Sequence, residues 1–164
     1  MKGAAGNAAL FYLLLGVVMG AFIFVAPNAL ARMRTEKLDI AKAGGGSAPF
    51  TVEIAESDQE KATGLMFRTQ LADSEGMLFP YKRVAEITMW MRNTYIPLDM
   101  VFIAADGTIH RIAARTEPLS DNIISSDGPV FAVLEIPGGA AERLGIKPGD
   151  RVHHPIFDKA ARAH

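Results

Sequence analysis

The sequence predicts an all-β domain with minor α content, a compact β-sandwich or barrel of about seven short strands with one or two short helices. Short runs in which apolar and polar residues alternate recur along the chain, and turn-forming residues separate them. Asp106-Gly107 lies between two such runs and is the strongest hairpin signal in the chain. The helical patterns after residue 48 are all short, which also favours a sheet built from antiparallel strands.

The first elements of the predicted domain are one strand and one short helix. Apolar residues alternate with polar ones over Phe50–Ala55, with the period of two that is typical of a strand. Ser57 or Asp58 is suited to cap a helical turn over residues 59–63, and Gly64 is suited to end it.

Apolar runs in the middle of the chain predict four more strands. A two-residue turn at Asp106-Gly107 places Ile103 opposite His110 and Val101 opposite Ile112. Asp99 then shares a face with Val101 and Ile103. The four predicted strands cover residues 76–80, 87–92, 98–105 and 108–115.

The last part of the domain follows a polar loop over residues 116–128. Gly145 is a typical stop for a short helix. We expect a strand over 130–136, a helix over 140–144 and a last strand over 151–157, which puts the domain at 49–158 and a tail at 159–164.

The N-terminal segment is predicted to be a signal peptide or membrane anchor over residues 1–31. An apolar run without any charge extends over 8–26, and Ala29-Leu30-Ala31 offers a small-x-small cleavage site. The positive charges that follow the run oppose simple export. We expect an exported, periplasmic or membrane-anchored protein whose domain lies outside the cytoplasm, held to the membrane through 8–26 if these residues are not cleaved. Residues 32–48, with Gly44-Gly45-Gly46-Ser47, are interpreted as a flexible linker.

Composition restricts the chemistry that the domain can perform. The formal net charge is -1, which gives no basic field for nucleic acid, and the chain has no cysteine, which excludes disulfides and thiolate sites. The adjacent His153 and His154 would point to opposite faces of a strand, so they do not chelate one ion easily. The sequence therefore predicts no structural metal and no cofactor.

Several motifs resemble the DUF192 family, in order and spacing, over residues 50–156. The family is a domain of unknown function, often exported, with a compact β-sandwich-like fold. The resemblance implies this fold and compartment and supplies no reaction. One position departs from the family pattern, with Arg92 where lysine is usual. The motifs are Gly64-Leu65-Met66-Phe67-Arg68, Gly76-Met77-Leu78-Phe79, Trp90-Met91-Arg92-Asn93-Thr94 with Ile96-Pro97-Leu98-Asp99, and Val133-Leu134-Glu135-Ile136-Pro137-Gly138-Gly139 with Gly145-Ile146-Lys147-Pro148-Gly149-Asp150.

The polar corner from Trp90 to Asp99 is the candidate binding site. Polar side chains placed among large apolar ones must be paired, so the corner is either a structural hydrogen-bond knot or the floor of a groove for a small ligand or an envelope protein. A buried Asp99 needs Arg92, Arg68 or backbone donors as its partner. The candidate ligand-binding residues are Trp90, Arg92, Asn93, Thr94, Asp99 and Arg68.

Two alternative functions remain open from the sequence. Asp99 and Glu135 could form an acid–base pair of an enzyme, provided that the fold brings the two carboxyl groups together. Met89 and Met91 could hold Cu(I) through their thioether sulfurs outside the cytoplasm. Methionines of this kind more often fill gaps in a core.

Overall fold

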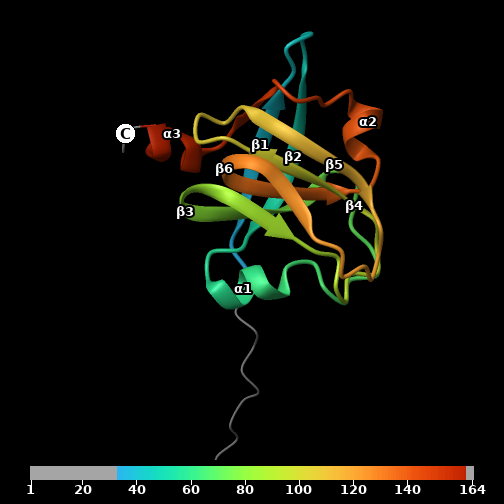
Figure 1. Cartoon of the computed structure of the whole chain (residues 1–164). Helices are drawn as coiled ribbons and strands as arrows, with labels where there is room; N and C mark the ends of the chain where they lie inside the picture. Colours follow the sequence, from blue (N-terminus) through green and yellow to red (C-terminus); the bar gives the residue numbers. More distant parts are fainter. Residues whose placement is uncertain (1–32, 162–164) are drawn as a thin grey trace, which may run out of the picture. The chain divides into compact units, whose positions relative to one another are not determined.

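The domain is a single strongly curled sheet of seven strands, seen in a computed structural model that describes residues 33–161, with side chains described as far as residue 158 (Figure 1). The strand order is β5-β4-β6-β3-β2-β1-β7. The elements are β1 (Thr35–Ala41), β2 (Ser47–Ile54), α1 (Asp58–Thr63), β3 (Glu75–Met89), β4 (Leu98–Ile103), β5 (Ile109–Thr116), β6 (Ile124–Pro137), α2 (Ala140–Leu144), β7 (Arg151–His153) and α3 (Pro155–Ala161).

The two edges of the sheet approach each other, so the sheet comes close to a barrel. β7 pairs with β1 at one edge, and Arg151 also forms a bridge with Thr108, just before β5 at the other edge. The Ile109 amide donates to the Asp150 carbonyl oxygen at 2.8 Å across this junction. The predicted fold class is therefore confirmed, with three short helices in the described part of the chain.

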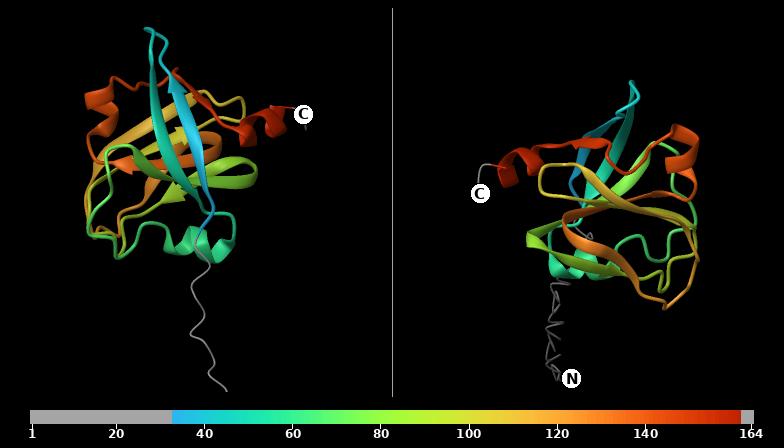
Figure 2. Two further views of the ribbon diagram at one scale, coloured as in Figure 1. Left: turned by 180° about the vertical axis from the view of Figure 1, so that it is seen from behind. Right: turned by 45° about the horizontal axis from the view of Figure 1, so that its top comes forward.

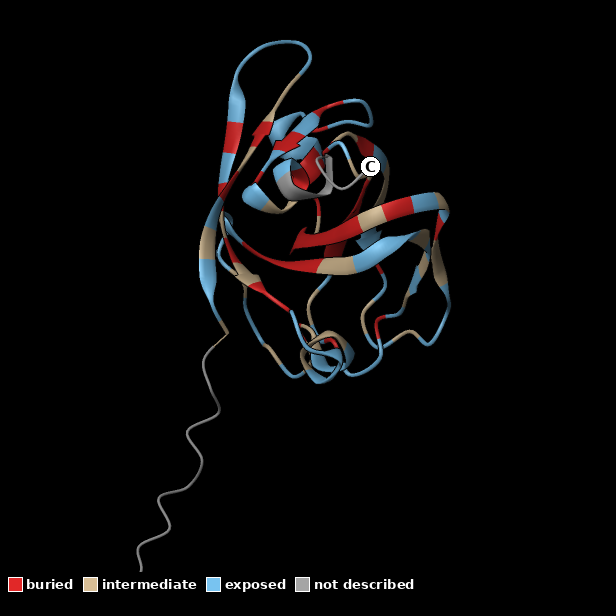
Figure 3. Ribbon diagram, turned by 90° about the vertical axis from the view of Figure 1, so that its left-hand side faces the viewer, coloured by how far each residue is buried: buried red, intermediate tan, exposed pale blue. Residues whose placement is uncertain are grey.

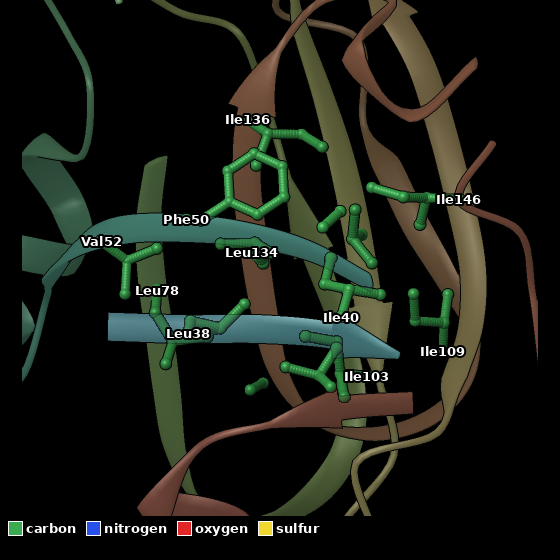
Figure 4. Close-up of a cluster of buried hydrophobic side chains, with 14 of the residues drawn as sticks. Leu38, Ile40, Phe50, Val52, Leu78, Ile103, Ile109, Leu134, Ile136 and Ile146 are labelled. Carbon is green, nitrogen blue, oxygen red and sulfur yellow. The ribbon is translucent and has the colours of Figure 1, made fainter. Parts of the chain in front are cut away.

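Each face of the curled sheet carries its own hydrophobic cluster. The inner cluster contains Phe50, Leu134 and Ile136, whose side chains converge between the strands (Figure 4). The alternate residues of β3, β4 and β6 form a second cluster on the opposite face, where Val133 and Leu65 are buried. The short β4 is thus buried on both faces, as are residues 76–79 of β3 and 132–136 of β6, whereas the rest of these two long strands is more exposed (Figure 3).

The predicted linker over residues 32–48 is wrong, because most of it belongs to the sheet. β1 pairs along its whole length with β2, and Leu38 and Ile40 are buried in the inner cluster. Only the turn between the two strands is glycine-rich, and it forms the tip of a hairpin that projects beyond the sheet (Figure 2). The folded unit therefore begins before Thr35 rather than at residue 49.

Three further boundaries differ from the sequence expectation. The strand predicted at 76–80 and the first half of the one predicted at 87–92 belong to the continuous β3, which ends at Met89 and whose pairing with β6 is interrupted by register shifts. In the hairpin, Val101 faces Ile112 as predicted, but a bulge places Ile103 opposite Ile109 instead of His110. The last strand ends at His153, because Pro155 starts a helix there.

The predicted short helices are confirmed, and α1 shows why. Ser57 accepts a hydrogen bond from the Glu60 amide, and the Glu60 carboxylate accepts one from the Ser57 amide, which together form a capping box. Gly64 closes this helix, as Gly145 closes α2. These caps fix where α1 ends and thereby position the segment that follows it.

The predicted signal peptide or anchor over 1–31 and the apolar run over 8–26 lie outside the described residues. Within residues 33–161, no helix is long and apolar enough to cross a membrane.

Candidate functional site

A cavity of about 250 Å³ lies where the end of α1 meets the face of β3 and β6 that carries the second cluster. Gly64, Leu65 and Met66 form one wall, directly after α1. Tyr81, Thr88, Met89 and Trp90 of β3 and its end form another. Glu135 of β6 also lines the cavity. This volume lies below the range of about 300–1,000 Å³ that is typical of sites for drug-sized ligands, so the cavity suits a molecule of only a few heavy atoms.

The side chain of Glu135 is placed by the sheet among sulfur-containing apolar residues. Its neighbours across the two ladders are Met77 on β3 and Met100 on β4, and both are fully buried. Residues directly opposite each other in a sheet share a face, so the carboxyl group stands in a row of methionines. Glu135 itself is 4% exposed.

No group of the described part of the chain compensates the Glu135 carboxyl. It takes part in none of the hydrogen bonds or ion pairs of the described residues and lies in the cavity lining instead. Burial in apolar surroundings raises its pKa to about 8, because the charged form loses its hydration without gaining a partner. At neutral pH this group is therefore mostly a neutral acid that both donates and accepts a hydrogen bond.

Gly64 keeps the cavity open above Glu135. A Cβ atom at this position would lie 3.3 Å from the ring of Phe79 and 3.9 Å from Glu135 Oε2. The glycine also has a φ of +49°, a region that L residues rarely adopt. Both the space and the backbone conformation explain a glycine between α1 and the cavity wall.

Tyr81 and Lys61 are the other titratable groups that line the cavity. Burial, and secondly the charge of Glu135, raise the pKa of Tyr81 to about 12, and its hydroxyl donates to Met89 Sδ at 3.7 Å. The Lys61 ammonium donates to the Glu56 carbonyl oxygen at 2.5 Å and lies 5.9 Å from the centre of the Tyr81 ring. Lys61 is thus engaged at the rim rather than with Glu135.

Trp90 is one of the two residues of the predicted site that line the cavity. It is 42% exposed and lines the opening. The Arg92 guanidinium stacks on its ring at 4.9 Å and pairs with Asp121 at 2.6 Å, so Arg92 supports the tryptophan and points away from Glu135. Thr94 also lines the cavity, with its hydroxyl 3.3 Å from the Arg92 carbonyl oxygen.

Asp99 is a structural hydrogen-bond knot and not part of the cavity. Its carboxylate accepts from the backbone amides of Arg115 at 2.7 Å, Gly139 at 2.8 Å and Ala141 at 2.9 Å. Two of these donors belong to the start of α2, so the carboxylate fastens that helix to the end of β4. The expected partners of Asp99 were Arg92, Arg68 or backbone donors. The structure shows backbone donors, and they lie outside the corner from Trp90 to Asp99.

The remaining two residues of the predicted site are engaged elsewhere. Arg68 forms a bidentate pair with Glu53, with both distances 2.7 Å. Asn93 has a φ of +55°, and its carbonyl oxygen accepts from the Phe67 amide at 2.8 Å, which ties two loops together. The structure therefore brings Trp90 and Thr94 to the cavity and leaves Arg68, Arg92, Asn93 and Asp99 outside its lining.

Neither alternative pairing from the sequence is formed. Asp99 lies on the face with Val101, whereas Glu135 lies on the face with Val133, so the two carboxyl groups are on opposite sides of the sheet. Met89 lines the cavity, but the Met91 sulfur is buried and accepts from the Thr116 hydroxyl at 3.1 Å. Among the described residues, no group of three histidine, cysteine or acidic side chains could hold a metal ion.

Sequence reasoning underestimated Glu135 and missed the residues around it. A glutamate inside the apolar run Val133-Leu134-Glu135-Ile136 was the available signal. Gly64, Met66 and Tyr81 come together only through the fold. The site thus excludes Asp99, which lies on the opposite face of the sheet, and retains Trp90 and Thr94 of the predicted corner.

Comparisons with known proteins agree with this fold. The model of the DUF192 family, described as "Uncharacterized ACR", matches residues 40–154. A crystal structure from Sinorhizobium meliloti 1021, described as a candidate transcription regulator, is 42% identical with a TM-score of 0.75 and covers 76% of this chain and 97% of its own. A protein of unknown function from Novosphingobium aromaticivorans DSM 12444 is also 42% identical, with a TM-score of 0.73 and coverage of 79% and 91%. The comparison with curated proteins found no match.

Proposed function

The chain belongs to the DUF192 family, and we propose that its folded domain binds a small ligand in the cavity above Glu135. The observation that carries this proposal is the carboxyl group of Glu135, which is buried, unpaired among the described residues and directed into an open cavity. A group of this kind costs folding free energy, so its presence favours a role that the fold alone does not require.

Binding is favoured over catalysis by the set of groups around the cavity. Glu135 is the one carboxyl group among its lining residues, and Asp99 is on the other side of the sheet. The other lining side chains are mainly aromatic, thioether or hydroxyl groups, which suit recognition of a small molecule. A side chain inserted by an envelope protein would be a second kind of occupant for the same cavity.

The description of the Sinorhizobium relative suggests DNA binding as a second candidate function, which the charges of this domain do not favour. The formal net charge is -1. Six of the arginines pair with acidic side chains at 2.6–2.9 Å, which reduces the positive field available to phosphates. These arginines are Arg34, Arg68, Arg92, Arg111, Arg115 and Arg143.

We also propose that the binding domain works outside the cytoplasm, in the periplasm or tethered to the membrane. The support is the apolar run over 8–26 followed by Ala29-Leu30-Ala31. Expressed in its host, the chain should fractionate with the envelope, and N-terminal sequencing should find Arg32 first if the signal is cleaved. Recovery of intact protein in the cytoplasmic fraction would overturn this part of the proposal.

The single tryptophan of the chain offers a direct test of the cavity, because Trp90 lies at its opening. A library of small amines, alcohols, sugars and carboxylates would be titrated against the full chain while Trp90 fluorescence is recorded. We expect saturable changes for at least one chemical class. Failure of every class to change the fluorescence would contradict a ligand site.

A pair of variants on α1 distinguishes the cavity from the rest of the surface. Ala62→Phe places a ring into the rim of the cavity from an exposed helical position, and it should abolish the fluorescence response. Gln59→Phe adds the same ring to an exposed position of α1 outside the lining, and it should leave the response unchanged. Equal responses in both variants would locate the binding elsewhere.

A further inference from the structure

We propose that the ligand of this cavity carries a protonated amine, which pairs with the Glu135 carboxylate and rests against the rings of Trp90 and Tyr81. This inference rests on the proposed binding function and specifies the chemical class of the ligand. It starts from the fact that Glu135 is the acidic group of the cavity lining and has no cationic partner in the described part of the chain.

The cavity lining combines aromatic rings with a carboxyl group that has no cationic partner among the described residues, and an ammonium group requires both. One wall contains the rings of Trp90 and Tyr81 with the thioether of Met89, and the wall after α1 contributes the thioether of Met66. Cations are attracted to aromatic faces, most strongly to that of tryptophan, and Trp90 already stacks with Arg92 at 4.9 Å. A carboxylate at the end of such a cavity completes a site for a cationic nitrogen with an apolar tail.

The internal cation nearest to the site does not fill this role. Lys61 lines the rim, but its ammonium donates to the Glu56 carbonyl oxygen and faces the Tyr81 ring. The titratable groups that face Glu135 are thus Tyr81 from β3 and Lys61 from α1, and its ladder neighbours Met77 and Met100 carry no charge. An anionic ligand would meet Glu135, and the cation of the lining, Lys61, is already engaged with the Glu56 carbonyl oxygen, so such a ligand fits the cavity least well.

The charge of the ligand predicts a particular pH dependence. Since Glu135 has a raised pKa of about 8, an ammonium ligand has to displace its proton at neutral pH. Affinity should therefore increase with pH, by up to about tenfold per unit below pH 8. A neutral ligand that bonds to the protonated acid should instead bind less tightly as the pH rises through 8.

Three probes with the same four-carbon chain test the inference on the full-length protein. n-Butylammonium, whose amine resembles that of lysine with a pKa of about 10.4, stays charged over the range of interest. 1-Butanol is neutral, and butyrate is anionic. Trp90 fluorescence should show n-butylammonium binding at least tenfold more tightly than 1-butanol at pH 8, and no saturable response to butyrate.

Two variants with the same Glu→Gln change test whether Glu135 causes the preference for n-butylammonium. Glu135→Gln should reduce the preference for n-butylammonium over 1-butanol to near one, and it should remove the pH dependence. The amide resembles the neutral acid in shape, so this variant should fold, which a cooperative thermal transition would verify. Glu117→Gln removes an exposed carboxyl outside the cavity lining and should change neither quantity.

These experiments can contradict the amine inference without contradicting the proposed ligand binding. Equal affinity for n-butylammonium and 1-butanol, or a preference that survives in Glu135→Gln, would overturn the amine inference while the Ala62→Phe block still supports a ligand site. No response to any of the three probes would also overturn the inference, and the wider library would then decide on the binding function.

Discussion

Asp99 on β4 and Glu135 on β6 are buried carboxyl groups on adjacent strands of one sheet, on its opposite faces. Asp99 accepts three backbone hydrogen bonds between 2.7 and 2.9 Å. Glu135 has no partner among the described residues, and burial raises its pKa to about 8. Equal burial therefore does not imply an equal role. The paired carboxylate holds the fold together, and the unpaired one is where a ligand would be stabilised.

Asp99→Asn is the largest test of this difference. Asn could keep its oxygen toward the amides of Arg115 and Gly139, but its own NH₂ group would face the amide of Ala141. A lost buried charge and an unmatched donor predict a decrease of about 3–5 kcal/mol in the free energy of unfolding. The urea midpoint at pH 7 measures it, with the exposed Asp121→Asn as the control. A decrease under about 1 kcal/mol would contradict the structural role of Asp99.

Glu135→Gln should increase the free energy of unfolding, whereas Asp99→Asn should decrease it. The folded chain keeps a proton on Glu135 up to about pH 8, whereas the pKa of a free glutamate is 4.5. Between these values the folded state binds more protons than the unfolded state, so the stability of the parent falls with pH by at most about 1.4 kcal/mol per unit. Glu135→Gln lacks this titration.

Denaturant midpoints of parent and Glu135→Gln at several pH values measure the effect. The variant should be the more stable protein at pH 8, with an advantage that grows between about pH 5 and 8 and is constant above it. Burial lowers the pKa of His154, but this group is common to both proteins and cancels in the difference. A difference that does not change with pH would mean that Glu135 titrates normally.

Arg92→Ala sharpens the comparison with a charge that is paired but exposed. The Arg92 and Asp121 side chains are 51% and 68% exposed, so water already stabilises both charges. We expect a change in unfolding free energy of less than about 1 kcal/mol. A loss as large as that of Asp99→Asn would show that pairing, and not burial, sets these energies.

The fold was largely predictable because it depends on local patterns. Alternation identified the central strands, Ser57 and Gly64 identified α1, and Asp106-Gly107 identified the hairpin. Leu38 and Ile40 show the same alternation, but the glycine-rich turn after them suggested a linker. Lys37 and Asp39 alternate with Leu38 and Ile40, so they lie on the other, more exposed face of β1.

The site was less predictable because its residues meet only in the folded chain. The sequence indicated that Asp99 would need a partner, but two of its donors are about 40 residues away at the start of α2. Trp90 was predicted as a site residue and lines the cavity, whereas Tyr81, which also lines it, gave no sequence signal. The register between β4 and β6 pairs Asp99 with Ile136, the residue next to Glu135. Successive side chains of a strand point to opposite faces, so Asp99 and Glu135 lie on opposite sides of the sheet.

The smallest effect concerns Tyr81, which reports the charge of Glu135 from inside the cavity. Burial is the larger cause that raises the Tyr81 pKa to about 12, and the Glu135 charge is the second. In Glu135→Gln the pKa of Tyr81 should therefore decrease slightly and stay above that of a free tyrosine, 10.0. Tyrosinate absorbance near pH 11, compared with the same protein carrying Tyr81→Phe, isolates this group. A Tyr81 pKa unchanged in Glu135→Gln would mean that the carboxylate lies too far from the ring to act on a cation bound between them.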